Sequence, residues 1–206
     1  MKQSHKILMT TFFLILAACV PLQAEDLSAW QGEFISRATL INHPEMESLY
    51  QDISKAAEAQ GKSYSAEDIK TYFKQLFHTD FSLIKITDNT VTYYHENPVS
   101  PPVTRTYTYT GEIADAYQKT TFSWHGFTSD GGGESDRRYT SLLMMKIHQH
   151  NNGVPHFHLR YAEVGQPPVT GPEFEQWWPT LLPSDTDITL FKKGADPERM
   201  ARLLLP

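Results

Sequence analysis

The sequence predicts a mainly β protein, an antiparallel barrel or sandwich with helices before and after it. Several short segments between residues 81 and 163 are rich in β-branched and aromatic side chains, as strands are. Turn-forming residues separate them, including three prolines within 98–102 and three consecutive glycines within 129–134. Helical patterns lie on both sides of this region. Strands that follow one another in this way favour an all-β barrel or sandwich.

Two helices are predicted ahead of the strands. Residues 44–60 are rich in helix-forming residues and end at Gly61, which suits a C-cap. The sequence 65–68 resembles a capping box, and apolar residues follow it with helical spacing: Ile69, Tyr72, Phe73, Leu76 and Phe77. Nearer the N-terminus, Trp30 and Phe34 are spaced to lie on one face of a short helix or turn, where they would anchor the core.

Six strands are predicted in the middle of the chain, at 81–87, 90–95, 103–110, 120–127, 139–148 and 156–163. Asp88 and Asn89 between the first two suit a two-residue hairpin turn. Three short elements are predicted after the strands: a helix at 173–178 stopped by Pro179, a last strand at 187–191, and a helix from Asp196-Pro197 to Leu204.

The N-terminus has the pattern of a secretory signal peptide. Two lysines within residues 1–6 precede an apolar run at 7–18. This run is shorter than the ~20 apolar residues that a membrane-spanning helix needs, and no later segment approaches that length. We therefore expect the mature protein to be extracytoplasmic.

Residues 16–19, Leu-Ala-Ala-Cys, resemble a bacterial lipobox, in which cleavage before the cysteine leaves that residue carrying lipid. The alternative is an ordinary signal peptide cut after Ala24. With lipidation, Val20 gives no inner-membrane retention signal, so we expect a periplasmic lipoprotein of the outer membrane. Cys19 is the only cysteine, which excludes an intramolecular disulfide and a thiolate metal ligand.

The chain length of 206 residues and the apolar content of 40% suit one sizeable domain. We predict a signal peptide at 1–18, a tether at 19–26 and one folded domain at 27–206. The net charge of −6 comes without an acidic or basic block, so nothing in it indicates a nucleic-acid partner.

Histidines carry the strongest chemical signal. Four of the nine lie between residues 148 and 158, as two His-x-His pairs: His148 with His150, and His156 with His158. On an extended strand, residues two apart point to the same face, about 7 Å apart. The Asn-Asn-Gly sequence at 151–153 favours a chain reversal that would bring the pairs face to face.

Such histidines suit a metal ion. Neutral imidazoles bind zinc at about 2.0 Å, and three of them with a water or a carboxylate complete its tetrahedron. Nickel and copper accept the same ligands, so the residues alone do not select the metal. The alternative is that these histidines are surface residues of a hairpin or members of a polar core. His78 and His125 are weaker candidates, and only as residues that would hydrogen-bond to the metal ligands.

Other chemistries lack their residues. No serine stands in a nucleophile-elbow motif, and the lone cysteine lies in the signal region. The three glycines are not followed by a lysine, which argues against a phosphate loop.

Several motifs resemble the ZinT family of periplasmic zinc-binding proteins, which also form the C-terminal domain of some zinc-uptake lipoproteins. The resemblance runs from Leu27 to about Pro183 and depends on motifs in the same order: Leu-Ser-Ala-Trp-Gln-Gly at 27–32, Asp-Ile-Lys-Thr-Tyr-Phe at 68–73, Thr79-Asp80, His156-Phe157-His158 and Trp178-Pro179-Thr180.

The resemblance implies a calycin-like, lipocalin-type barrel with extra helices and a zinc site of three histidines at its mouth. Two of the family's ligands correspond to His156 and His158. The third lies upstream, in a segment slightly shorter than the family pattern; we expect His148, with His150 as the rival or an added ligand. A histidine-rich N-terminal stretch and a cysteine pair, present in some members, are missing here. A single site is therefore expected, without high-capacity scavenging.

Three functions follow as hypotheses. The first, which the resemblance supports, is zinc capture and delivery beside a zinc importer, by a protein that is not an enzyme. The second is a zinc-dependent hydrolase or lyase, which would need a general base beside the metal-bound water. The third is a barrel that carries an apolar small molecule, with the aromatic residues, 12% of the chain, lining its pocket.

Overall fold

The structure is a computed structural model that describes residues 26–97, 99–117, 120–129, 137–150, 153–163, 176–203 and 205. The signal peptide, Cys19 and Ala24 lie outside these residues, so the domain boundaries stay a prediction. Within the described ranges, no helix combines the length and the apolar character needed to cross a membrane.

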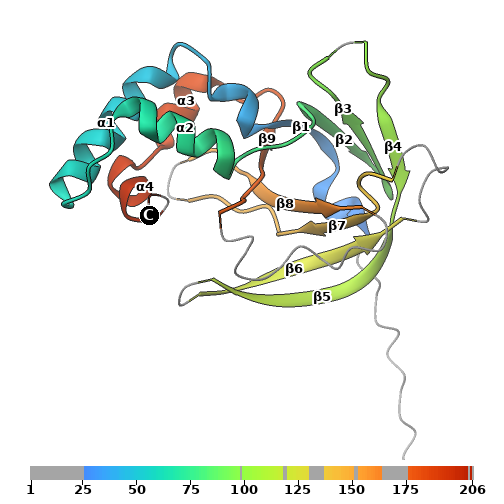
Figure 1. Cartoon of the computed structure of the whole chain (residues 1–206). Helices are drawn as coiled ribbons and strands as arrows, with labels where there is room; N and C mark the ends of the chain where they lie inside the picture. The colour runs from blue at the N-terminus through green and yellow to red at the C-terminus, as the bar shows by residue number, and fades with distance from the viewer. Residues whose placement is uncertain are drawn as a thin grey trace, which may run out of the picture.

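The described strands form one antiparallel sheet of nine strands that curls into a half-barrel (Figure 1). Their order across the sheet is β4-β3-β2-β1-β9-β8-β7-β6-β5. The strands are β1 (Gly32–Ser36), β2 (Leu83–Thr87), β3 (Thr90–Tyr94), β4 (Val103–Thr106), β5 (Thr108–Tyr117), β6 (Thr120–Thr128), β7 (Ser141–Met144), β8 (Phe157–Ala162) and β9 (Thr180–Pro183). The predicted mainly β antiparallel fold is confirmed.

Helices from both ends of the chain gather beside one end of the half-barrel (Figure 1). They are the four α-helices α1 (Met46–Ala59), α2 (Ala66–Leu76), α3 (Ile188–Gly194) and α4 (Pro197–Leu203), while two 3₁₀ helices, η1 (Leu27–Trp30) and η2 (Arg37–Leu40), stand before and after β1 in the chain. The predicted capping box of α2 is present: the Asp68 N–H donates to Ser65 Oγ at 3.1 Å, and the Ser65 N–H donates to the Asp68 carboxylate at 2.9 Å. Helices at both ends of the chain are therefore confirmed.

The first hairpin has the predicted two-residue turn. Thr87 of β2 pairs with Thr90 of β3, and Asp88 takes the positive φ of 51° that such a turn requires. The predicted strand 103–110 is divided into β4 and β5, which lie at opposite edges of the sheet. Tyr107 stands between them in the chain and donates its N–H to the Asn89 carbonyl at 2.8 Å. The predicted strand 139–148 continues only to Met144.

Three predictions near the ends of the chain were wrong. Phe34 lies in β1 and not on a short helix, although it is buried with Trp30 as expected. Residues 187–191 begin helix α3, because the Asp187 carboxylate caps it by accepting the Thr189 N–H at 2.7 Å. The last strand is instead β9, and the described end of the predicted helix 173–178 is not helical.

The core has two parts. One fills the inside of the half-barrel and includes Trp30, Phe34 and Phe157. The other lies between the helices and the sheet, where α1 and α2 bury an apolar face against residues such as Trp124 and Trp178. The indole N–H of Trp30 donates to the Met145 carbonyl at 2.8 Å and fixes the chain just after β7. The segment that carries the four histidines thus starts from a buried, hydrogen-bonded point.

Candidate metal centre

The four clustered histidines lie on the connection between β7 and β8, where the chain reverses. His148 and His156 form an antiparallel bridge in which each backbone N–H donates to the other's carbonyl oxygen at 2.9 Å. The Gly153 N–H donates to the His150 carbonyl at 2.9 Å, although residues 151–152 lie outside the described part. The two histidine pairs therefore face each other, as the sequence predicted.

The imidazole rings converge on one small volume. The ring centroid of His148 lies 4.4 Å from that of His156, 5.0 Å from that of His150 and 5.4 Å from that of His158. The centroid of His156 lies 5.2 Å from that of His150 and 5.6 Å from that of His158. Two imidazoles bound to one zinc ion at about 2.0 Å in a tetrahedral arrangement would have centroids about 5 Å apart. All five measured distances are close to this value.

One combination of ligand atoms is especially tight. One imidazole nitrogen each from His148, His150 and His156 lies within 4.8 Å of the other two. Among the described residues no other group of three histidine, cysteine or acidic side chains is this close. His148 and His156 are common to this set and to the sequence-predicted set, which has His158 in place of His150.

Hydrogen bonds fix the tautomer of three of the rings. His148 Nδ1 lies 3.0 Å from the Lys146 carbonyl oxygen, and His156 Nδ1 lies 3.0 Å from that of Val154. A carbonyl oxygen only accepts, so each Nδ1 carries the proton and each Nε2 keeps its lone pair. Such partners orient a metal-binding histidine and raise its basicity.

His158 is oriented by a neighbouring strand. It pairs with Thr180 of β9, and its Nδ1 lies 3.0 Å from Thr180 Oγ1. The Thr180 hydroxyl donates its one proton to the Trp178 carbonyl at 2.9 Å, so it accepts from His158. His158 therefore also has a protonated Nδ1 and a free Nε2.

Burial favours the neutral form of His150, His156 and His158 by lowering their pKa values. Desolvation is the main cause that lowers the pKa of His156 to about 4, and the adjacent histidines and Arg37 lower it further. The pKa of His158 is well below its usual value, again because of burial first and then the charges of His156 and His148. Desolvation followed by the charge of Arg199 lowers the pKa of His150. Neutral imidazole is the form that binds a metal.

The histidines line a cavity of about 860 Å³ between the sheet and the helices. Aromatic and aliphatic side chains form much of the wall, among them Phe77, Phe122 and Trp178. A metal ion with one bound water molecule occupies only a small part of this volume. The cavity therefore has room for a further ligand beside the histidines.

Several residues of this centre were not found by sequence reasoning. Thr180 orients His158, and Arg37 lines the cavity, but neither stands near the histidines in sequence. The supporting role suggested for His78 and His125 stays a prediction: His125 lines the same cavity as the four histidines, and His78 is not among the residues that line it. The His78 carbonyl instead accepts the Trp177 indole N–H at 2.9 Å, and His125 packs against Trp30 with the ring centroids 5.4 Å apart.

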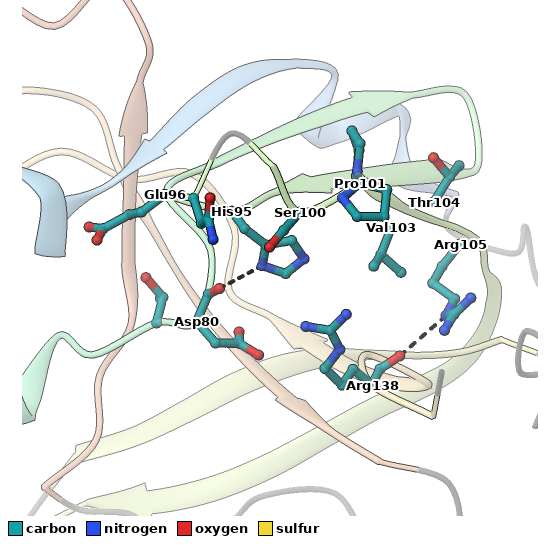
Figure 2. Close-up of a pocket in the computed structure, with 12 residues that line it drawn as sticks. Asp80, His95, Glu96, Ser100, Pro101, Val103, Thr104, Arg105 and Arg138 are labelled. Carbon is teal, nitrogen blue, oxygen red and sulfur yellow. Dashed lines mark hydrogen bonds between the residues drawn. The ribbon is translucent and has the colours of Figure 1, made fainter. Parts of the chain in front are cut away.

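A second cavity, of about 630 Å³, lies on another part of the half-barrel (Figure 2). His95 Nδ1 donates to the Asp80 carbonyl at 2.8 Å, and Arg105 Nε donates to the Arg138 carbonyl at 3.2 Å. Figure 2 shows the His95 ring and the Arg138 guanidinium turned into the same space. Among the described residues, the potential metal ligands of this cavity form no group as close as His148, His150 and His156, so we place the candidate metal centre at the histidine cavity.

Comparisons with known proteins identify the family of the chain and similar folds. Residues 20–192 match the profile of a family described as ZinT (YodA) periplasmic lipocalin-like zinc-recruitment. The crystal structure of the Zn(II)-bound ZinT-like domain of Streptococcus pneumoniae AdcA is similar, with 18% identity and a TM-score of 0.55 over 88% of this chain and 92% of that one. Zn(II)-bound AdcA itself matches with 20% identity and a TM-score of 0.55, over 88% of this chain and 36% of that one. No curated protein sequence matches the chain.

Proposed function

The chain belongs to the ZinT family of periplasmic, lipocalin-like zinc-recruitment proteins, and from this premise we propose that it captures zinc through His148, His156 and His158. The family recruits zinc and does not catalyse a reaction, in agreement with the prediction that the chain is not an enzyme. The half-barrel with helices at both ends is the lipocalin-like fold expected of a member.

The observation that carries this ligand assignment is the set of Nδ1 hydrogen bonds. His148, His156 and His158 each have an acceptor at 3.0 Å from Nδ1. Each can therefore bind a metal through Nε2 without losing an existing hydrogen bond. A pre-oriented ligand loses less side-chain entropy when the metal binds, so the zinc affinity is higher.

His150 is the remaining imidazole within reach. It is exposed, whereas His156 and His158 are partly buried, and no Nδ1 hydrogen bond holds its ring among the described contacts. Ordering this side chain on zinc would cost more conformational entropy than ordering the other three. We therefore place it outside the three main ligands, as a competitor with a ligand from solution for the fourth position, and expect it to contribute less to affinity.

The site takes zinc as cargo. Release is favoured when the pH falls, because protons compete with the metal for Nε2. Copper and nickel bind imidazole sites as well, and copper binds more tightly in the general order of stabilities. Other divalent transition metals are thus expected to compete with zinc in vitro, and delivery would be to a zinc importer or its binding protein.

We also propose that the protein is tethered to the outer membrane by lipid on Cys19. Support comes from the Leu-Ala-Ala-Cys sequence at 16–19 and from the residue after Cys19, valine, which is not a retention signal. A tether of several residues up to Asp26 would separate the domain from the membrane surface.

Calorimetric zinc titration of residues 20–206 tests the ligand assignment. Single replacements by alanine at His148, His156 or His158 are expected to abolish the tight site, and replacement at His150 to weaken it less. If all four replacements lowered the zinc affinity equally, His150 would be a ligand equal to the other three. An unchanged isotherm for His156→Ala would overturn the assignment.

A further inference from the structure

Arg37 is a buried cation beside the histidines. Its side chain is 9% exposed and lies in η2, between β1 and α1. The guanidinium carbon is 3.9 Å from the ring centroid of Phe77, and the rings of Phe73 and Phe191 lie at 5.5 and 5.3 Å. Burial lowers its pKa to about 10, so it still carries a positive charge at neutral pH.

This charge has no anionic partner among the described residues. Nη2 of Arg37 is buried without a hydrogen-bond partner, and no carboxylate contributes to its electrostatic environment there. Arg160, another buried cation, is different because its Nη1 lies 3.3 Å from the Asp115 carboxylate. Buried charges in proteins are paired as a rule, so an unpaired guanidinium that faces a cavity indicates an anion from solution.

Arg37 lines the same cavity as the four histidines. Zinc bound by neutral imidazoles would add two positive charges there, and Arg199 also lines the wall. The wall also carries two carboxylates, Glu112 and Asp196, and a further cation, Lys146, so positive charges outnumber negative ones once zinc is bound. The loaded cavity is therefore cationic and favours an anionic fourth ligand.

We propose that Arg37 anchors a carboxylate subsite, so that zinc is captured together with a small organic carboxylate that reaches both the guanidinium and the metal. This rests on the proposed function, since it requires zinc at the histidines. The planar fork of arginine matches a carboxylate in a bidentate way, and carboxylate oxygen is also a zinc ligand. The aromatic walls formed by Phe77, Phe122 and Trp178 and the volume of about 860 Å³ suit an organic body attached to that carboxylate.

The test uses the full domain loaded with Co²⁺, whose visible spectrum reports its ligands. Benzoate, acetate and inorganic phosphate are titrated into the loaded protein in a buffer that does not bind metal. Wild type is expected to bind benzoate with a saturable spectral change. Arg37→Met is expected to weaken this binding by about tenfold or more, because a charge-assisted bidentate pair is lost. Arg138→Met, which removes an exposed arginine of the other cavity, is the matched control and is expected to bind benzoate like wild type.

A second readout separates anion binding from a structural role. Arg37→Met removes an unpaired buried charge and keeps an apolar chain of similar length, so the melting temperature of the metal-free protein is expected to stay the same or rise. If the charge of Arg37 instead stabilised the fold, the melting temperature of Arg37→Met would fall clearly. Arg37→Lys keeps the positive charge but lacks the planar guanidinium, and it replaces Arg37→Met in the test if that variant does not fold. It too is expected to bind benzoate more weakly than wild type.

The outcomes are distinct. Equal benzoate binding by wild type and Arg37→Met, or no spectral change with any anion, would overturn the subsite while leaving zinc capture in place. Tighter binding of phosphate than of benzoate would overturn the assignment to an organic carboxylate. Failure of the wild-type protein to bind Co²⁺ or Zn²⁺ at all would remove the proposed function itself.

Discussion

The Thr180 hydroxyl gives the sharpest test of how the fold prepares its ligands. Replacing Thr180 by valine keeps the shape of a buried, β-branched side chain, which is 2% exposed, and removes only the hydroxyl. His158 Nδ1 then loses its acceptor at 3.0 Å, and the Trp178 carbonyl loses its donor at 2.9 Å. Loss of such an outer partner weakens metal binding by roughly 10–100-fold, or about 1.4–2.8 kcal/mol.

The assay is zinc titration by calorimetry, with thermal unfolding of the metal-free protein alongside. Stability is expected to fall by about 1–3 kcal/mol, since a buried donor and acceptor are left unsatisfied. Thr180→Ser keeps a hydroxyl and is expected to restore most of the affinity. Thr186→Val is the control, because that hydroxyl donates only to the Pro183 carbonyl at 2.6 Å, away from the histidines. A zinc affinity of folded Thr180→Val within twofold of wild type would refute the role of this hydrogen bond.

Three further predictions concern pH, folding and export. Since the pKa of His156 is about 4 in the folded protein and 6.5 in the reference state, the unfolded chain takes up the proton first. The metal-free protein should therefore keep its full stability above pH 6.5 and lose on the order of 3 kcal/mol towards pH 4. Denaturant unfolding at several pH values measures this loss, and a free energy of unfolding that stays constant between pH 6.5 and pH 4 would contradict the prediction. Ser65→Ala removes the capping box of α2 and should cost about 1 kcal/mol in the same assay with zinc affinity unchanged; unaltered stability would show that the cap contributes nothing. Cys19→Ser should abolish incorporation of labelled palmitate and release the protein from the membrane fraction, whereas labelling that persists would exclude the lipobox.

Much of the fold was predictable where local chemistry decides it. The capping box of α2, the Asp88 turn and the start of α4 depend on neighbouring residues, and the structure has all three. The strand β1 was missed because its five residues, Gly32–Ser36, lack a clear alternation, and their pairing with β2 and β9 supplies what the local sequence does not. Tertiary pairing overrides local preference in such short segments.

The same division applies to the metal centre. The two His-x-His pairs and the turn between them are local, so the convergence of His148 and His156 could be predicted. Thr180 and Arg37 could not be found this way, because they reach the cavity from β9 and η2, far from the histidines in sequence. Only the sheet order, which puts β9 beside β8, brings Thr180 to His158. Whether His150 or His158 is the third ligand also depends on three-dimensional geometry.

A crystal of the zinc-loaded protein, measured on both sides of the zinc absorption edge, tests the central claim most directly. We expect one strong anomalous peak in the cavity, about 2.0 Å from Nε2 of His148, His156 and His158. A peak bound by His148, His150 and His156 with His158 Nε2 out of reach would contradict the ligand assignment. A peak away from all four histidines would contradict the account of the site as a whole.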